Sequence, residues 1–153
     1  YVALIGNHDI LGNGKEVFEQ VYGDENFAFI AGNTKFVCMN TNALEYDYSH
    51  PVPDFDFISR EAADSARYSK TVAVMHVKPY DDQFNNNVAR LFHAEIKKFP
   101  SLQFALHAHN HKLQTTDVFK DGIIYYGCAS MKQRNYMVFT LTTNGYSYEV
   151  VNY

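Results

Sequence analysis

Three short apolar runs of this chain each end in a segment that carries histidine. They are Val2–Ile5 followed by Gly6-Asn7-His8-Asp9, Val72–Met75 followed by His76, and Gln103–Leu106 followed by His107-Ala108-His109-Asn110-His111. A continuous apolar run of this length is typical of a strand that is covered on both faces of a sheet. If the three strands are parallel neighbours, their carboxyl ends share one edge, which is where open α/β sheets bind ligands. We therefore expect these histidines to converge on one rim and to form a metal site there.

His109 and His111 have the spacing of two ligands on one segment. In an extended segment, residues i and i+2 point to the same side, so both imidazoles can face one centre. Imidazole together with amide or carboxylate oxygen suits Zn, Mn or Fe, and no thiolate stands at ligand spacing. The alternative is that these histidines are polar residues at strand ends that bind no metal.

The segment Gly6-Asn7-His8-Asp9 has a chemistry of its own. Gly6 permits a tight turn after the strand, and Asn7 offers a neutral carbonyl oxygen to a metal. His8 can exchange a proton with a reacting group, and the adjacent Asp9 can hold its imidazole in one tautomer. The alternative is an ordinary turn whose side chains cap their own backbone.

The rest of the sequence predicts the elements that position these residues. Helices are expected over 15–22, 54–68 and 88–99, and strands over 27–30 and 34–40 around a turn at Gly32-Asn33. After His111 only strands are expected, with hairpin turns at Lys120-Asp121-Gly122 and Thr143-Asn144-Gly145. The polar stretch Asn42–Asp54, with Tyr46, Tyr48 and His50, is typical of a loop. The pattern predicts an α/β fold with sheets packed together, helices outside and a mostly antiparallel C-terminal portion.

The composition narrows the class of protein. A chain of 153 residues with 46% hydrophobic content can bury the core of one domain. The net charge of -4 argues against a nucleic-acid surface held by bulk electrostatics. No stretch reaches the roughly 18 apolar residues of a membrane helix, and no targeting segment is present. We therefore expect a soluble protein, and the sequence does not indicate its cellular compartment. Cys38 and Cys128 could form a disulfide or remain reduced thiols in the core.

The ordered series Gly6-Asn7-His8-Asp9, His76 and Ala108-His109-Asn110-His111 resembles the calcineurin-like metallophosphoesterases. The pattern of that family is Asp-x-His, Gly-Asp-x-x-Asp, Gly-Asn-His-Asp/Glu, a lone His and Gly-His-x-His. The resemblance spans essentially the whole chain but includes only the last three of these motifs. It implies that the chain is part of a four-layer α/β/β/α sandwich with mixed sheets.

The same resemblance implies a role for each matching residue. The metal ligands would be Asn7, His76 and His109 for one ion and His111 for the other. His8 would stabilise or protonate the leaving group, with Asp9 as its partner. The reaction would be hydrolysis of a phosphate mono- or diester by attack of a metal-activated hydroxide on phosphorus. The ions would be Mn, Fe or Zn, and the identity of the phosphoester stays open.

Two departures from the family pattern differ in weight. Ala108 replaces the first Gly of Gly-His-x-His, which is a small change. The absence of Asp-x-His and of the bridging Asp of Gly-Asp-x-x-Asp is a large one. The segment Gly23-Asp24-Glu25-Asn26-Phe27 does not supply the second motif, because it has Phe27 at the second Asp position and lies after Gly-Asn-His-Asp. We therefore expect residues 1–153 to be a single incomplete domain of a truncated enzyme, completed by a preceding segment or by another chain. Alone it would hold fewer than two metals and be inactive.

Two other functions compete with the phosphoesterase. The first is a non-catalytic metal-binding or interaction module that keeps only half of the site, although the pair of His8 and Asp9 argues against a pure scaffold. The second is a mononuclear zinc hydrolase that uses His107, His109 and His111, and it leaves the segment Gly6–Asp9 without a role.

Overall fold

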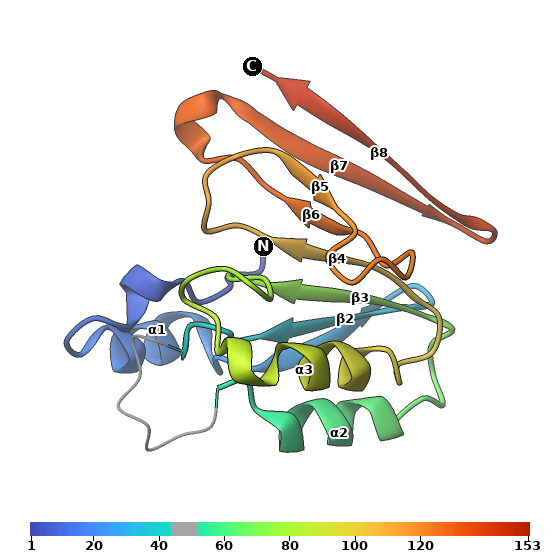
Figure 1. Cartoon of the computed structure of the whole chain (residues 1–153), viewed down its shortest axis with the longest axis horizontal. Coiled ribbons are helices and arrows are strands. Elements are labelled where there is room, and N and C mark those ends of the chain that lie inside the picture. The colour runs from blue at the N-terminus through green and yellow to red at the C-terminus, as the bar shows by residue number, and fades with distance from the viewer. Residues whose placement is uncertain (44–51) are drawn as a thin grey trace.

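The computed structural model describes residues 1–43 and 52–153, and Figure 1 shows how its elements are arranged. The helices are η1 (Asn7–Ile10), α1 (Gly14–Tyr22), α2 (Phe55–Ala63), η3 (Asn86–Val88), α3 (Ala89–Ile96) and η4 (Met131–Gln133), where η marks a 3₁₀ helix. The strands are β1 (Phe27–Ala31), β2 (Thr34–Met39), β3 (Lys70–Met75), β4 (Leu102–His107), β5 (Gln114–Thr116), β6 (Tyr125–Gly127), β7 (Asn135–Thr142) and β8 (Gly145–Asn152). The loop residues Tyr46, Tyr48 and His50 lie outside the described residues.

The main sheet is mixed and has six strands in the order β1-β2-β3-β4-β6-β5. Its four central strands, β2, β3, β4 and β6, run parallel to one another, whereas β1 and β5 pair antiparallel at the two edges. Strands β7 and β8 form a separate antiparallel hairpin around the predicted turn at Gly145. The prediction of an α/β fold with an antiparallel C-terminal end is thereby confirmed.

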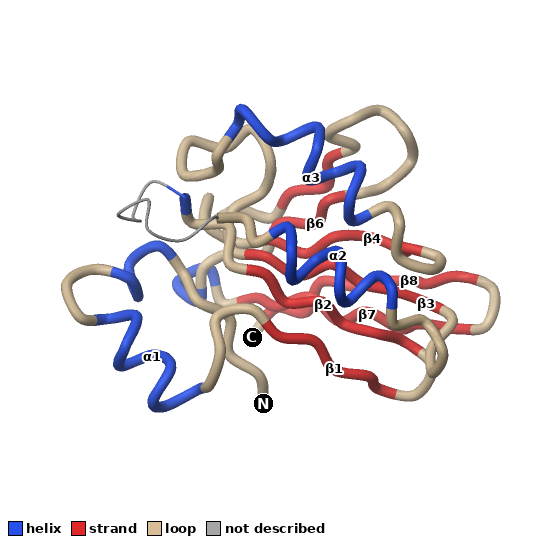
Figure 2. The backbone as a smooth tube through the Cα atoms, turned by 90° about the horizontal axis from the view of Figure 1, so that it is seen from below, coloured by secondary structure: helices blue, strands red, loops and turns tan. Residues whose placement is uncertain are grey.

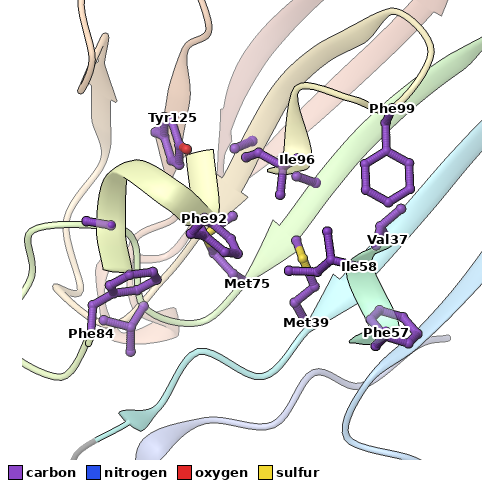
Figure 3. Packing of buried hydrophobic residues seen from close by; sticks show 14 residues of the cluster. Val37, Met39, Phe57, Ile58, Met75, Phe84, Phe92, Ile96, Phe99 and Tyr125 are labelled. Atoms are coloured by element: carbon purple, nitrogen blue, oxygen red, sulfur yellow. The ribbon is translucent and has the colours of Figure 1, made fainter. Parts of the chain in front are cut away.

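The two faces of the main sheet are covered by different elements. Helices α2 and α3 pack on one face, where Ile58 and Phe92 are fully buried against β3 and its neighbours (Figures 2 and 3). The hairpin β7–β8 packs on the other face, where Phe139 stacks on Phe104 with ring centroids 4.6 Å apart. Alternation along β3 explains this division, because Val72 belongs to the cluster under the hairpin and Ala73 to the cluster under the helices. The described residues therefore form three layers, α/β/β.

One predicted strand is wrong. Residues 1–6 carry no regular secondary structure, and Val2 is 52% exposed although Ile5 is fully buried. Among the described residues, this segment pairs with none of the strands of the main sheet, whose order is β1-β2-β3-β4-β6-β5. The apolar character of the segment has another use, since Ile5 packs with Ile10 of η1 and Phe18 of α1.

The other predicted elements differ from the structure mainly at their ends. Asp54 caps α2 as expected, with its carboxylate accepting a hydrogen bond from Phe57 N at 2.9 Å, but the helix ends at Ala63 and not near Tyr68. Cys38 and Cys128 are both free thiols, which decides between the two alternatives for the cysteines. None of the helices in residues 1–43 and 52–153 combines the length and the apolar character that crossing a bilayer requires.

Candidate metal centre

The parallel strands bring the predicted histidine segments to one rim of the main sheet. His76 follows β3 directly, and the backbone N–H of Ala108, just after β4, donates to the carbonyl of His76 at 3.0 Å. The N-terminal segment reaches the same rim because Asn42 Nδ2 donates to the carbonyl of Ile5 at 3.1 Å. The three segments therefore converge on one rim as the sequence indicated, although residues 1–6 reach it without forming a strand.

Asn7 and His76 are in direct contact. The side-chain oxygen Oδ1 of Asn7 lies 3.0 Å from Nε2 of His76, and Asn7 is only 7% exposed. The ring of His109 lies next, with its centroid 5.4 Å from that of His76 and the two planes nearly perpendicular at 75°. The 3.0 Å separation of Asn7 Oδ1 and His76 Nε2 is that of a hydrogen bond, and it is a little shorter than the roughly 3.4 Å between two donors that bind one tetrahedral zinc ion at about 2.1 Å each.

The surroundings of His76 keep its imidazole neutral. Burial is the main reason that its pKa is lowered to about 4; His109 lowers it further and Asp9 opposes the change. His111 and His8 also lower the pKa, so both lie within electrostatic reach of this ring. A neutral imidazole is the form that can bind a metal through nitrogen.

The segment that carries His109 and His111 is not extended, so the predicted reason for their shared direction is wrong. Both residues have positive φ, 61° at His109 and 56° at His111. The backbone N–H of Asn110 donates to the carbonyl of Ala108 at 2.7 Å, which makes His109 the central residue of a γ-turn. Ala108 is not among the residues with positive φ, so alanine is compatible with the backbone at that position.

Two aspartates that the sequence analysis did not single out lie against this turn. Asp82 Oδ1 is 3.0 Å from His109 Nε2, and Asp81 Oδ2 accepts a hydrogen bond from Asn110 Nδ2 at 2.8 Å. Asp81 also forms an ion pair with Lys78. No motif or periodicity in the sequence marks Asp81 and Asp82. They reach the turn only because the loop after β3 folds back over the end of β4.

The pair of His8 and Asp9 adopts a different arrangement from the predicted partnership. His8 is exposed on η1, and the Asp9 carboxylate accepts a hydrogen bond from the backbone N–H of Gly6 at 2.8 Å. Through this bond the Asp9 carboxylate caps the turn to which Asp9 itself belongs. Space is tight at Gly6, because a Cβ there would lie 3.2 Å from Asp9 Oδ2 and 3.2 Å from His76 Cε1.

His107 lies beneath the rim and not on it. It is 2% exposed, and its Nε2 atom has no hydrogen-bond partner within residues 1–43 and 52–153. Burial lowers the pKa of His107 to about 4. Its position beneath the rim argues against the three-histidine zinc alternative, which needs His107 as a donor.

A polar segment after β2 was also missed by sequence reasoning. Asn40, Thr41 and Asn42 are all 1% exposed or less. Thr41 Oγ1 donates to the carbonyl of Val77 at 2.8 Å, and Asn42 holds Ile5 as described above. These bonds tie the ends of β2 and β3 to the segment that carries Asn7. Consecutive buried polar residues directly after a strand are the signal that could have revealed them.

The donors at the rim fit one metal ion better than two. Asn7, His76 and His109 supply one amide oxygen and two imidazoles, a set that suits a divalent transition metal. Among the described residues, no three His, Cys, Asp or Glu side chains form a group that could hold a metal. His111 is exposed, and its backbone carbonyl accepts a hydrogen bond from Gln133.

No protein-family model matches this chain, and no curated protein matches it either.

Proposed function

We propose that this chain is the C-terminal part of a metal-dependent phosphoesterase of the calcineurin-like kind, which hydrolyses a phosphate mono- or diester. The observation that carries the proposal is the contact of 3.0 Å between Asn7 Oδ1 and His76 Nε2 with the His109 ring beside it. These residues come from three distant parts of the sequence, and each matches a ligand position of the family pattern. A structural role alone gives no reason for three such donors to meet at the carboxyl edge of parallel strands.

The residues at this site would have two roles: some would bind a metal ion, and one would donate a proton. Asn7, His76 and His109 would hold one ion, and His111 would be available to a second. Metal ions bound in such a site supply a nucleophilic hydroxide near neutral pH and neutralise charge on the phosphoryl group. His8 is exposed beside this set and would donate a proton to the leaving oxygen.

In the proposed enzyme, the described residues would form only part of a larger domain. The observed α/β/β layers would be three of four layers in an α/β/β/α sandwich. The Asp-x-His motif and the bridging Asp would be supplied by residues outside this sequence. Without them we expect one ion per chain and no turnover.

The test is metal content together with hydrolysis of a chromogenic aryl phosphate monoester and diester. We expect about one zinc or manganese ion per chain, loss of that ion in His109→Ala, and retention of it in the neighbouring His111→Ala. His111→Ala is a matched control because the two residues share one turn. Unchanged metal content in His109→Ala would contradict the ligand assignment, and two ions per chain with turnover would contradict the incomplete site.

A non-catalytic metal-binding module is the second candidate, because one observation favours it. Asp9 caps Gly6, and among the described residues no hydrogen bond joins its carboxylate to His8. Turnover that appears when the missing motifs are restored, and disappears again in His8→Ala, would exclude this candidate.

A further inference from the structure

The turn that carries His109 and His111 is strained, and something must hold it. A γ-turn with positive φ at its central residue is rare, and positive φ is unfavourable for residues other than glycine. Here two histidines separated by one residue both have it. Strained backbone at a functional site persists only where neighbouring structure stabilises it.

The loop after β3 supplies that stabilisation through Asp81. The side chains of Lys78 and Asp81 are only 13% and 11% exposed, and they form an ion pair through Oδ1 of Asp81. The other carboxylate oxygen, Oδ2, accepts the hydrogen bond from Asn110 Nδ2 at 2.8 Å. Asn110 is the residue between the two histidines, and its own N–H closes the γ-turn. A hydrogen bond to an ionised group is roughly twice as strong as a neutral one.

The second contact to the turn is weaker. Asp82 reaches His109 Nε2 at 3.0 Å, but the Asp82 side chain is 80% exposed, so water competes for its carboxylate. The hydrogen bond to His109 lowers the pKa of Asp82, which keeps this carboxylate ionised without burying it. The buried Asp81 is therefore the better anchor.

We propose that Asp81, fixed by Lys78, is a positioning residue for the His109–His111 turn and acts through Asn110. The inference rests on the proposed function, because the two histidines matter as ligands. Each oxygen of Asp81 already makes a contact, Oδ1 with Lys78 and Oδ2 with Asn110. Residues that orient metal ligands typically change metal affinity by about 10- to 100-fold when they are removed.

The first test is a double-mutant cycle with zinc as the probe and the full chain as the protein. Asp81→Ala and Asn110→Ala should each weaken zinc binding by about 10-fold or more, measured by calorimetric titration. The double variant should be no weaker than the weaker single one, because both changes remove the same contact. Losses that add in the double variant, or a single variant that binds zinc like the parent, would overturn the proposal.

Two further variants set the scale of the effect. Asp82→Ala should weaken zinc binding less than Asp81→Ala does. Asp24→Ala removes an exposed carboxylate for which the described part of the chain shows no hydrogen bond or ion pair, and it should leave the affinity unchanged. If Asp81→Ala does not fold, Asp81→Asn replaces it: this variant keeps an oxygen for Asn110 but loses the charge that Lys78 pairs with, and its affinity should fall to an intermediate value.

The second test needs no metal and separates this inference from the proposed function. Without zinc, the Asn110 amide hydrogen should exchange with solvent at least several-fold faster in Asp81→Ala than in the parent chain, because the turn opens. Equal exchange rates would refute the positioning role even if zinc binds. A parent chain that binds no zinc would refute the proposed function, while the exchange rates would still decide whether Asp81 holds the turn.

Discussion

Gly6 is the residue at which the geometry of the rim is most restricted. Its φ of -101° is open to any amino acid, so the restriction comes from its neighbours and not from its backbone. A Cβ at this position would meet both the Asp9 carboxylate and the His76 ring at 3.2 Å. Glycine therefore serves here to let the His76 ring lie close to the turn that carries Asn7.

Replacement of Gly6 by alanine tests this reading. We expect Gly6→Ala to weaken zinc binding several-fold, because the added methyl group pushes the His76 ring away from Asn7 Oδ1 by a few tenths of an ångström. The free energy of unfolding should change by less than about 1 kcal/mol, since only one side of the turn is crowded. Titration calorimetry and chemical denaturation measure the two effects, and a loss of stability without any loss of zinc affinity would contradict the prediction.

Sequence reasoning worked at the residue scale where a side-chain type follows an apolar run. It placed Asn7, His76 and His109 at one edge, and the structure brings them together. It missed Asp81 and Asp82, because a loop residue acquires its partner only through tertiary folding. It also predicted the wrong backbone for His109, since a histidine carries no signal for positive φ.

At the scale of elements, the approach of β6 to β4 and β5 depends on Gly127. A Cβ on Gly127 would lie 2.8 Å from His107 Cε1 and 3.0 Å from Gln114 Cβ. These three residues belong to the three adjacent strands at this end of the sheet. His107 is buried under the rim, so its ring has little room to move.

We expect Gly127→Ala to lower the free energy of unfolding by roughly 1–3 kcal/mol, the usual cost of overpacking a filled core. The same change in a His107→Ala background should cost less, because the closest clash has been removed. Urea denaturation of the four proteins completes the cycle. Equal costs in both backgrounds would show that the imidazole is not the limiting contact.

Element boundaries show where the sequence was informative. The helix over 15–22 and the strand pair around Gly32-Asn33 match α1, β1 and β2 closely, because helical spacing of apolar residues and a glycine turn are local signals. Val2–Ile5 has the apolar content of a buried strand, but whether a segment pairs with a strand depends on the whole sheet and not on its own residues.

At the scale of the whole molecule, α3 is tied to the loop between β5 and β6 by one carboxylate. Asp121 Oδ2 lies 2.9 Å from His93 Nε2 and also pairs with Lys97. The hydrogen bond from Lys97 lowers the pKa of Asp121 far below its ordinary value of 3.8, and the bond from His93 acts in the same direction. Because the pKa is lower in the folded state, the unfolded chain binds the proton first on acidification.

The sign of the pH dependence follows from this difference. The contribution of Asp121 to stability is fully present above its unfolded pKa and is lost as the pH falls below about 4 toward the lower folded pKa. We expect Asp121→Asn to cost roughly 1 kcal/mol at pH 7, the scale of a partly exposed ion pair. The difference between variant and parent should shrink from pH 4 to pH 2 in thermal or urea unfolding. A difference that stays constant over that range would show that the charge is not what matters.

The mixed α/β class and the antiparallel C-terminal end could be predicted because the alternation of apolar and polar residues and the turn residues are local features of the sequence. The assignment of faces could not, since the apolar runs of β3 and β4 are covered on both sides and favour neither. Which layer the hairpin would form became visible only from its contacts with Phe104 and Tyr126.

The parallel order of β2, β3, β4 and β6 also determines when the rim can exist during folding. Thr34 of β2 pairs with Lys70 of β3, and Thr71 of β3 pairs with Leu102 of β4, so each pairing closes a loop of about 30 residues. The hairpins β1–β2 and β7–β8 close much shorter loops and can form sooner. We therefore expect Asn7, His76 and His109 to become neighbours only after these longer loops have closed.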